Sequence, residues 1–195
     1  MNQKGSKNRK SEDRLKLDIK RNDYDNRTLD IYETNPEHLD ALLELENYEK
    51  DGVYFECCCG INRFLENRLK ELGYDCYGTD ILYGDDFLDF TGTTDYIITN
   101  PPFNLNLEFT EKCFEVVKKK FSFLVPLNYL DTMKRYKIFH NADFPIKNIF
   151  VFSKRISFLK GGGIPEKCIT GMSFCWITWD REYKGKPYVE WIKKF

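Results

Sequence analysis

The sequence predicts an α/β fold built on a single mixed, mostly parallel sheet that is flanked by helices. Two observations support this class: short apolar runs of strand character alternate with amphipathic runs of helical period, and a turn-forming residue closes most of the strand runs. Such alternation is typical of parallel strands joined by right-handed crossovers. With 195 residues, 42% of them hydrophobic, the chain suits one domain with a sizeable core. Ligands of such folds bind beyond the carboxyl ends of the strands, so function is expected there.

The amino-terminal residues 1–27 are polar and lysine-rich and show no apolar periodicity. They predict a flexible basic arm ahead of one folded domain at 28–195 that has no separate target-recognition domain. A first helix is expected after Asn35-Pro36, because leucines then recur at helical spacing and proline suits the first helical turn. These leucines are Leu39, Leu42, Leu43 and Leu45.

The middle of the chain predicts four strands, with helices between them. Apolar runs favour strands at residues 53–57, 75–79, 95–99 and 121–125. Amphipathic spacing favours one helix that ends before Gly73 and a second helix at 107–119. In the second half we expect a helix at 128–140 and strands at 146–152 and 172–179. Residues 155–171, which include three consecutive glycines, are expected to form a mobile loop.

Composition restricts the location of the protein and the redox state of its cysteines. No stretch approaches the roughly 18 apolar residues that span a bilayer, and the polar start lacks the apolar core of a signal peptide. We therefore expect an intracellular protein without a membrane partner. Three of the seven cysteines are consecutive, Cys57 to Cys59, a spacing that suits neither disulfides nor a metal site. Reduced, buried thiols are expected, with no metal.

Charge is distributed unevenly along the chain. Residues 1–21 carry a net charge of +5, residues 22–116 of −16 and residues 117–195 of +10, although the whole chain has a net charge of −1. Basic ends are compatible with a polyanionic partner, whereas charge runs are also common on solvated surfaces.

A cofactor is predicted at the turn that follows the first of the four middle strands. Glu56 ends this strand, Gly60 permits close approach of the backbone, and Asp80 ends the next strand, where a carboxylate can accept both hydroxyls of a ribose. Nicotinamide cofactors require G-x-G-x-x-G for their pyrophosphate, and this turn has one glycine followed by Asn62. A cofactor without phosphates fits better, and S-adenosylmethionine meets that condition.

Asn100-Pro101-Pro102-Phe103 follows the strand at 95–99 and is the strongest catalytic candidate. The two prolines fix the backbone, so that the Asn100 amide oxygen and a proline carbonyl are rigid acceptors. Two acceptors aimed at the hydrogens of a conjugated amino group favour a pyramidal nitrogen and stabilise its developing positive charge. Phe103 is suited to stack on a planar base. This pattern predicts methylation of an amino group without a covalent intermediate.

These motifs, in this order, resemble those of phage and prophage DNA N6-adenine methyltransferases. The resemblance covers residues 32 to about 180. It rests on Tyr32-x-Thr34-x-Pro36, Glu56-x-x-x-Gly60, Thr79-Asp80-Ile81, Asp86-Phe87-Leu88 and Thr99-Asn100-Pro101-Pro102-Phe103. It implies a Rossmann-like class I methyltransferase fold with a seven-strand-type sheet, S-adenosylmethionine as cofactor and a bacterial cytoplasmic location for a phage- or prophage-encoded enzyme, of the kind found in restriction-modification.

The same resemblance assigns roles to the cofactor residues. Tyr32 and Thr34 would border the methionine end, and Glu56, Cys58 and Gly60 would form the cradle. Asp80 with Ile81 would hold the ribose, and Asp86 with Phe87 the adenine, with the adjacent Asp85 as the alternative to Asp86. Asn100 of the catalytic loop would contact the cofactor as well. The family usually has G-x-G in this turn, so that Asn62 is a departure.

The substrate is expected to be DNA. Lys154 and Arg155 could pair with phosphates, and Phe158 could stack on a base. The tetrapeptide at Asn100 also serves enzymes that methylate protein glutamine or RNA adenine, which remain alternatives. A catalytically silent nucleic-acid-binding protein of this fold is a further alternative. The oligomeric state does not follow from the sequence.

Overall fold

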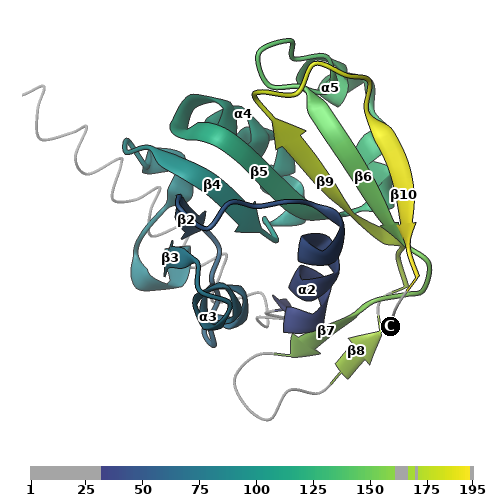
Figure 1. The fold of residues 1–195 in the computed structure, drawn as a ribbon. Helices are drawn as coiled ribbons and strands as arrows, with labels where there is room; N and C mark the ends of the chain where they lie inside the picture. Colours follow the sequence, from purple (N-terminus) through teal and green to yellow (C-terminus); the bar gives the residue numbers. More distant parts are fainter. Residues whose placement is uncertain (1–31, 161–166, 170, 194–195) are drawn as a thin grey trace, which may run out of the picture. The chain divides into compact units, whose positions relative to one another are not determined.

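The computed structural model describes residues 32–160, 167–169 and 171–193, so the predicted basic arm at 1–27 lies outside the described residues. The main sheet has seven strands in the order β10-β6-β9-β5-β4-β2-β3 (Figure 1). They are β2 (Val53–Glu56), β3 (Asp75–Gly78), β4 (Thr94–Thr99), β5 (Val117–Pro126), β6 (Ile146–Phe152), β9 (Phe174–Asp180) and β10 (Tyr188–Ile192).

The sheet is mixed and mostly parallel, which confirms the predicted class. β3, β2, β4 and β5 run parallel to one another, and β10 runs parallel to β6. β9 lies antiparallel between β5 and β6. The carboxyl ends of β2, β3, β4 and β5 therefore share one edge of the sheet, where the predicted site residues follow the strands.

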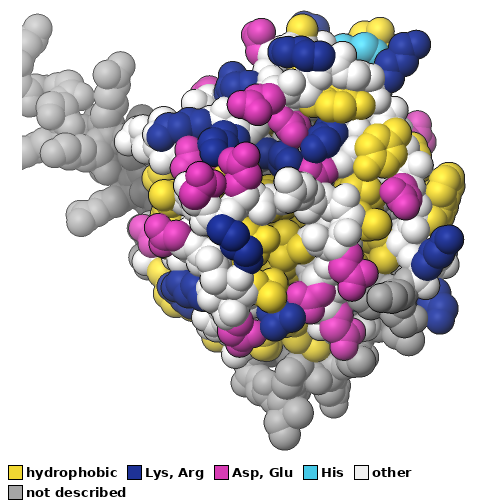
Figure 2. Space-filling view, viewed as in Figure 1, with side chains coloured by type: hydrophobic (Ala, Val, Ile, Leu, Met, Phe, Trp, Pro, Cys, Tyr) yellow, Lys and Arg dark blue, Asp and Glu magenta, His cyan; other side chains and the backbone are white. Residues whose placement is uncertain are grey.

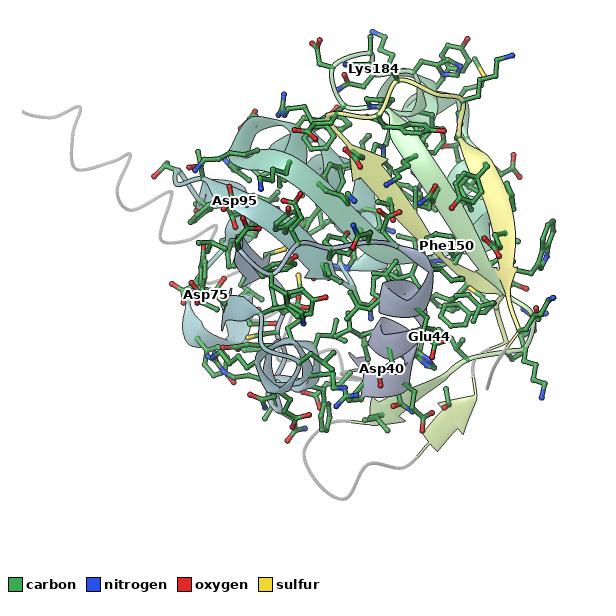
Figure 3. The ribbon with its side chains drawn as sticks, viewed as in Figure 1. Asp40, Glu44, Asp75, Asp95, Phe150 and Lys184 are labelled. Carbon is green, nitrogen blue, oxygen red and sulfur yellow. The ribbon has the colours of Figure 1, made fainter. Side chains whose placement is uncertain are left out.

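Helices cover both faces of the sheet. α2 (Pro36–Leu45) and α3 (Phe64–Glu71) pack on one face, and α4 (Asn106–Val116) and the short α5 (Tyr136–Phe139) on the other. Side chains of β4 alternate between the two faces of the sheet. Tyr96 and Ile98 belong to the core that includes residues of α2 and α3, and the intervening Ile97 belongs to the core that includes residues of α4 and α5. A strand that is buried on both faces is apolar along its whole length. The two helices on the first of these faces are also joined by a hydrogen bond: Asp40 of α2, which is labelled in Figure 3, accepts it from Arg68 of α3.

Two predicted helices are corrected by the structure. The helix expected at 107–119 ends at Val116, because Val117 and Lys120 pair with β4 as the start of β5. The helix expected at 128–140 is broken into η4 (Leu127–Leu130), η5 (Met133–Arg135) and α5. Extended backbone at Thr132, with φ −156° and ψ 138°, interrupts it. Tertiary pairing and local turns thus override helical periodicity.

The loop expected at 155–171 contains two strands instead. β7 (Ser157–Lys160) and β8 (Lys167–Ile169) pair antiparallel, and β1 (Tyr32–Thr34) joins the other side of β7. Neither β1 nor β10 was predicted from the sequence, because these short strands are specified by long-range pairing such as that of Thr34 with Phe158. The glycines at 161–163 lie outside the described residues.

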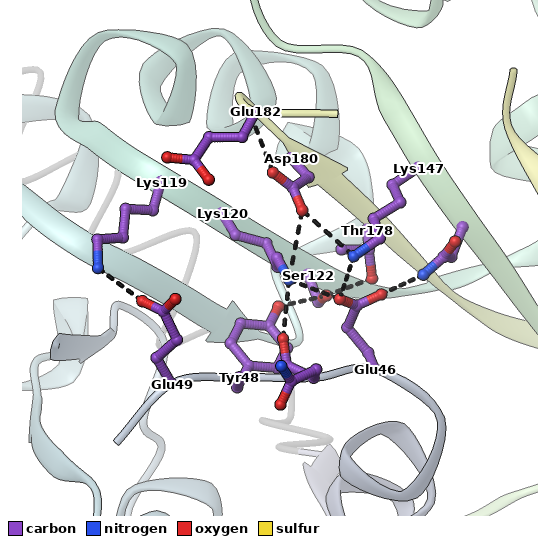
Figure 4. A network of polar contacts seen from close by, with 12 residues as sticks. Glu46, Tyr48, Glu49, Lys119, Lys120, Ser122, Lys147, Thr178, Asp180 and Glu182 are labelled. Atoms are coloured by element: carbon purple, nitrogen blue, oxygen red, sulfur yellow. Dashed lines mark hydrogen bonds and ion pairs between the residues drawn. The ribbon is translucent and has the colours of Figure 1, made fainter. Parts of the chain in front are cut away.

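A charged network holds the end of α2 against the sheet (Figure 4). Glu46, which is 2% exposed, lies 2.5 Å from the Lys120 ammonium and 2.8 Å from the Lys147 ammonium. Asp180 lies 3.3 Å from both lysines, and Asn148 donates to the second Glu46 oxygen. Two carboxylates and two ammonium groups balance one another in this network.

Pairs of this kind mix the charges that the sequence separates. Lys119 and Lys120 of the basic half contact Glu49 and Glu46 of the acidic half. On the face shown in Figure 2, Lys and Arg side chains accordingly lie among Asp and Glu side chains. Segment charge along the sequence is therefore a poor guide to the charge of this face.

Candidate active site

The turn after β2 has the tight backbone that the glycine predicted. Gly60 has φ +64°, and a Cβ at this position would lie 2.8 Å from the Glu33 Oε1 atom. The Gly60 N–H donates to Asp80 Oδ2 at 3.0 Å, and the Cys58 N–H donates to Glu56 Oε1 at 3.0 Å. The turn, the end of β2 and the end of β3 are therefore linked by hydrogen bonds.

Asp80 lies where the ribose acceptor was predicted, at the edge beyond β3. Its second oxygen, Oδ1, accepts the Leu82 N–H at 3.0 Å, so that both oxygens hold backbone groups. A carboxylate has about four acceptor sites. Asp80 can therefore fix the turn and still accept further hydrogen bonds, while the adjacent Ile81 is 39% exposed.

Glu56 is fully buried at the end of β2. The Thr99 hydroxyl at the end of β4 donates to Glu56 Oε1, and Glu56 Oε2 has no hydrogen-bond partner among the described residues. Burial raises the pKa of Glu56 to about 8. At neutral pH this carboxyl group is therefore largely protonated in the free protein.

The other cofactor residues differ in how they are placed. Asp86 is half-buried and caps η2 (Phe87–Asp89) by accepting the Leu88 N–H at 3.0 Å. Phe87 is 3% exposed, with its ring packed 5.0 Å from that of Phe109, so only its backbone is available to a ligand. Thr34 is buried at 5% exposure. The backbone of Tyr32 belongs to β1, and its side chain lies outside the described residues.

The cysteines of the turn are free thiols. The Cys57 thiol and burial hold the pKa of Cys58 well above its ordinary range, and burial raises the pKa of Cys57 to about 11. Protonated thiols are weak nucleophiles, so these cysteines are suited to packing beside a ligand rather than to covalent chemistry.

Asn100 presents an unsatisfied acceptor directly after β4. Its Oδ1 atom is buried and has no hydrogen-bond partner among the described residues. Pro101 is buried, and the Pro102 carbonyl accepts the Leu105 N–H at 2.9 Å, so the Pro102 carbonyl is engaged within the loop. Phe103 is 38% exposed, and its ring centroid lies 5.6 Å from that of Phe174. The hydrogen bond between Thr99 and Glu56 brings this loop beside the turn after β2 that contains Gly60, which we call the cofactor turn.

A hollow of about 370 Å³ opens at the same edge, and sequence reasoning missed it. It is lined by Pro126, Leu127, Asn128, Met172 and Ser173. Phe174, which contacts Phe103, directly follows Ser173. Asn128 could have been found from the sequence, since it comes just after a predicted strand; Ser173 could not, because β9 is antiparallel and brings its first residues to this edge.

The predicted substrate residues are split between the surface and the core. Arg155 is exposed and donates to the Ser173 hydroxyl at 2.6 Å, which places it beside the hollow, and Lys154 is exposed next to it. Phe158 is 1% exposed, with its ring packed edge-on against Phe174 at 5.1 Å. A ring covered in this way has no free face for a base, so Phe158 is removed from the candidate substrate surface.

No family model and no curated protein matches this sequence. Solved structures match its fold. The modification subunit of a putative type I restriction enzyme from Vibrio vulnificus YJ016 matches with a TM-score of 0.59 at 14% identity, over 100% of this chain and 54% of that one. The type I restriction-modification methyltransferase subunit from Streptococcus thermophilus matches with a TM-score of 0.56 at 13% identity, over 82% and 46%.

A putative class I S-adenosylmethionine-dependent methyltransferase from Listeria monocytogenes matches with a TM-score of 0.52 at 16% identity, over 80% of this chain and 61% of that one. This chain thus spans about half the length of the two restriction subunits. Together with the sheet order, these likenesses define the fold as the Rossmann-like fold of class I methyltransferases. In the described part of the chain, no helix is long and apolar enough to cross a membrane.

Proposed function

We propose that this chain is an S-adenosylmethionine-dependent methyltransferase that methylates the N6 amino group of adenine in DNA. The observation that carries the proposal is the buried Asn100 Oδ1 atom, which has no partner among the described residues and stands on a proline-fixed loop next to the cofactor turn. An orphaned acceptor costs folding free energy, and Asn106 Oδ1 and Asn148 Oδ1 are in the same state among the described residues. The position of Asn100 on the loop after β4, at the edge of the sheet, is what favours a ligand with N–H groups for this atom.

The residues at the turn fit the proposed cofactor. Gly60 and Glu56 form a cradle for its methionine part, Asp80 has acceptor sites for two ribose hydroxyls, and the half-buried Asp86 carboxylate is available to the adenine. When bound, S-adenosylmethionine supplies a methyl group on a sulfonium that carries no phosphate. Similarity to the Listeria monocytogenes structure supports this choice of cofactor.

Asn100 and the Pro101 carbonyl act on the substrate amine. Both are acceptors, so they orient the two N–H bonds and stabilise positive charge as the nitrogen lone pair is drawn out of conjugation. A carboxamide has no useful proton affinity, so Asn100 is no general base, and the surplus proton passes to water after transfer. The exposed Phe103 ring stacks on the flipped base, and its contact with Phe174 joins it to the neighbouring hollow.

Two observations favour a nucleic acid as the substrate, and a third favours DNA. Arg155 lies exposed beside the hollow, and the exposed Lys154 precedes it in the chain, so that both are candidates for phosphate contacts. Asn128 and Ser173 give the hollow polar groups for the edge of a base. Two structurally similar proteins are subunits of restriction-modification systems. The proposal includes expression from a phage or prophage in the bacterial cytoplasm.

The test is incubation of the full chain with S-adenosylmethionine labelled in its methyl group and with DNA, RNA or protein, followed by digestion. Label in N6-methyladenine from DNA is the expected result, and the Asn100→Ala variant is the control for background. Label in RNA adenine or in protein glutamine would replace the substrate but keep the chemistry. Saturable nucleic-acid binding without cofactor binding would identify a silent protein of this fold.

A further inference from the structure

Glu33 of β1 reaches over the cofactor turn from outside the main sheet. Its Oε1 atom accepts the Asn62 backbone N–H at 2.6 Å, and its Oε2 atom accepts a hydrogen from the Asn62 side-chain amide. A Cβ atom added to Gly60 would have this same Oε1 atom as its nearest neighbour, so Glu33 fills the space beside Gly60. Glu33 thus holds a fixed position above the turn.

This carboxylate is buried, and no positive partner is found among the side chains that the structure describes. Glu33 is 6% exposed, and no lysine, arginine or histidine whose side chain is described forms an ion pair with it, a statement that leaves out Lys160 and Lys167. Both of its hydrogen bonds come from neutral amide groups of Asn62. A buried anion that is hydrogen-bonded only to neutral donors is costly, and a cationic ligand group would compensate the charge.

The turn around Glu33 is rigid. Tyr83 donates to the Gly60 and Ile61 carbonyls at 3.2 and 3.3 Å, which ties the turn to η1 (Ile81–Tyr83). Arg63 ends the turn with φ +52°, a strained angle for a residue other than glycine, and its guanidinium donates to the Gly78 carbonyl at 3.2 Å. A ligand therefore meets Glu33 in a position that is already set, which lowers the ordering cost of binding.

We propose that Glu33 is the carboxylate that recognises the cationic amino group of the cofactor's amino-acid part, and that Asn62 is the residue that positions it. This inference rests on the proposed function and adds a residue for which the sequence motifs gave no role. Glu56 is a poorer candidate for the same task, because its raised pKa leaves it largely uncharged near neutral pH.

Calorimetric titration of the full chain with two probes tests the assignment. S-adenosylhomocysteine carries the cationic amino group, whereas 5′-methylthioadenosine shares the nucleoside and sulfur but lacks the amino-acid part. Glu33→Gln removes the charge and keeps one acceptor oxygen for the Asn62 backbone N–H, while its NH2 group can donate to the Asn62 side-chain oxygen once that amide turns over. We expect it to weaken S-adenosylhomocysteine binding about 10- to 100-fold, as expected for loss of an interaction between charged groups, and to change methylthioadenosine binding less than about twofold.

Asn62→Ala separates positioning from charge. It removes the side-chain donor to Glu33 Oε2 but keeps the backbone N–H that donates to Oε1, so the carboxylate remains and is held by one hydrogen bond in place of two. The loss for S-adenosylhomocysteine should therefore be smaller than with Glu33→Gln, and methylthioadenosine binding should again change little. Wild-type affinity of Glu33→Gln for S-adenosylhomocysteine, or an equal loss for both probes, would overturn the assignment and leave the proposed function intact. If the wild-type chain binds neither probe, the proposed function fails together with the inference.

Discussion

The Thr99 hydroxyl donates to Glu56 across 2.5 Å and joins the ends of two neighbouring strands. β2 leads from Glu56 into the cofactor turn, and β4 leads from Thr99 into the Asn100 loop. Because the two strands are parallel and paired, with Tyr54 opposite Tyr96, their carboxyl ends emerge side by side. The proposed methyl donor and acceptor sites are thereby fixed to one rigid edge.

Replacing Asn100 tests the proposed acceptor. Asn100→Ala removes the buried Oδ1 atom, and we expect methyl transfer to fall at least about 10²- to 10³-fold, the usual effect of losing one preorganised transition-state contact. Cofactor affinity should stay within about twofold. Single-turnover kinetics and calorimetry measure the two quantities, and Asn104→Ala, an exposed asparagine in the same loop, is the matched control. Unchanged turnover by Asn100→Ala would contradict the assignment.

The raised pKa of Glu56 predicts a pH dependence of stability. Burial raises this pKa from 4.5 to about 8, so the folded chain keeps a proton that the unfolded chain releases between these values. The stability that this proton confers is full below about pH 4.5 and is lost as the pH rises to about 8. Glu56→Gln has no ionisable group at this position and is the reference. Relative to it, the free energy of unfolding of the wild type should fall by on the order of a few kcal/mol across this pH window. Urea unfolding of both proteins from pH 5 to 9 measures the difference. Parallel curves for the two proteins would show that Glu56 titrates normally.

The network at Glu46 predicts a large loss of stability. Glu46→Ala leaves the ammonium groups of Lys120 and Lys147 sharing only Asp180, and removal of one partner from a buried ion-pair network costs about 3–5 kcal/mol. Chemical denaturation followed by circular dichroism measures this loss. Glu115→Ala, which breaks an exposed pair with Lys112, is the matched control and should hardly move the unfolding midpoint. Equal midpoints for the two variants would show that the network adds no stability.

Arg155 predicts the salt dependence of DNA binding. Arg155→Ala should weaken binding of a duplex and lower the slope of log affinity against log salt concentration by about 1, as expected for one phosphate contact. Fluorescence anisotropy at several salt concentrations measures the slope. Lys184→Ala is the control, since Lys184 is an exposed cation between β9 and β10 (Figure 3). The same slope for Arg155→Ala and the wild type would remove Arg155 from the interface.

Local sequence patterns were sufficient to predict the fold class and the order of the motifs along the chain. Gly60, Asp80 and Asn100 each follow a strand run that is visible in the local pattern, and parallel strands carry their ends to one edge. The sequence pattern therefore predicted that the turn at Gly60 lies beside the loop at Asn100. The sequence also shows Asn62 where the family usually has a glycine, but its neighbours along the chain give no reason for an asparagine there.

The tertiary structure decided which distant residues complete the site. Glu33 reaches Asn62 from β1, a three-residue strand held by β7, and Ser173 reaches the hollow because β9 runs antiparallel to β5. It also placed Phe158 in the core, although its sequence context favoured a base-stacking role. Strand register and burial depend on contacts between residues that lie far apart in the sequence, 29 positions for Glu33 and Asn62 and more than a hundred for β1 and β7. Periodicity and turn residues report only on the nearest neighbours, so they could not reveal these contacts.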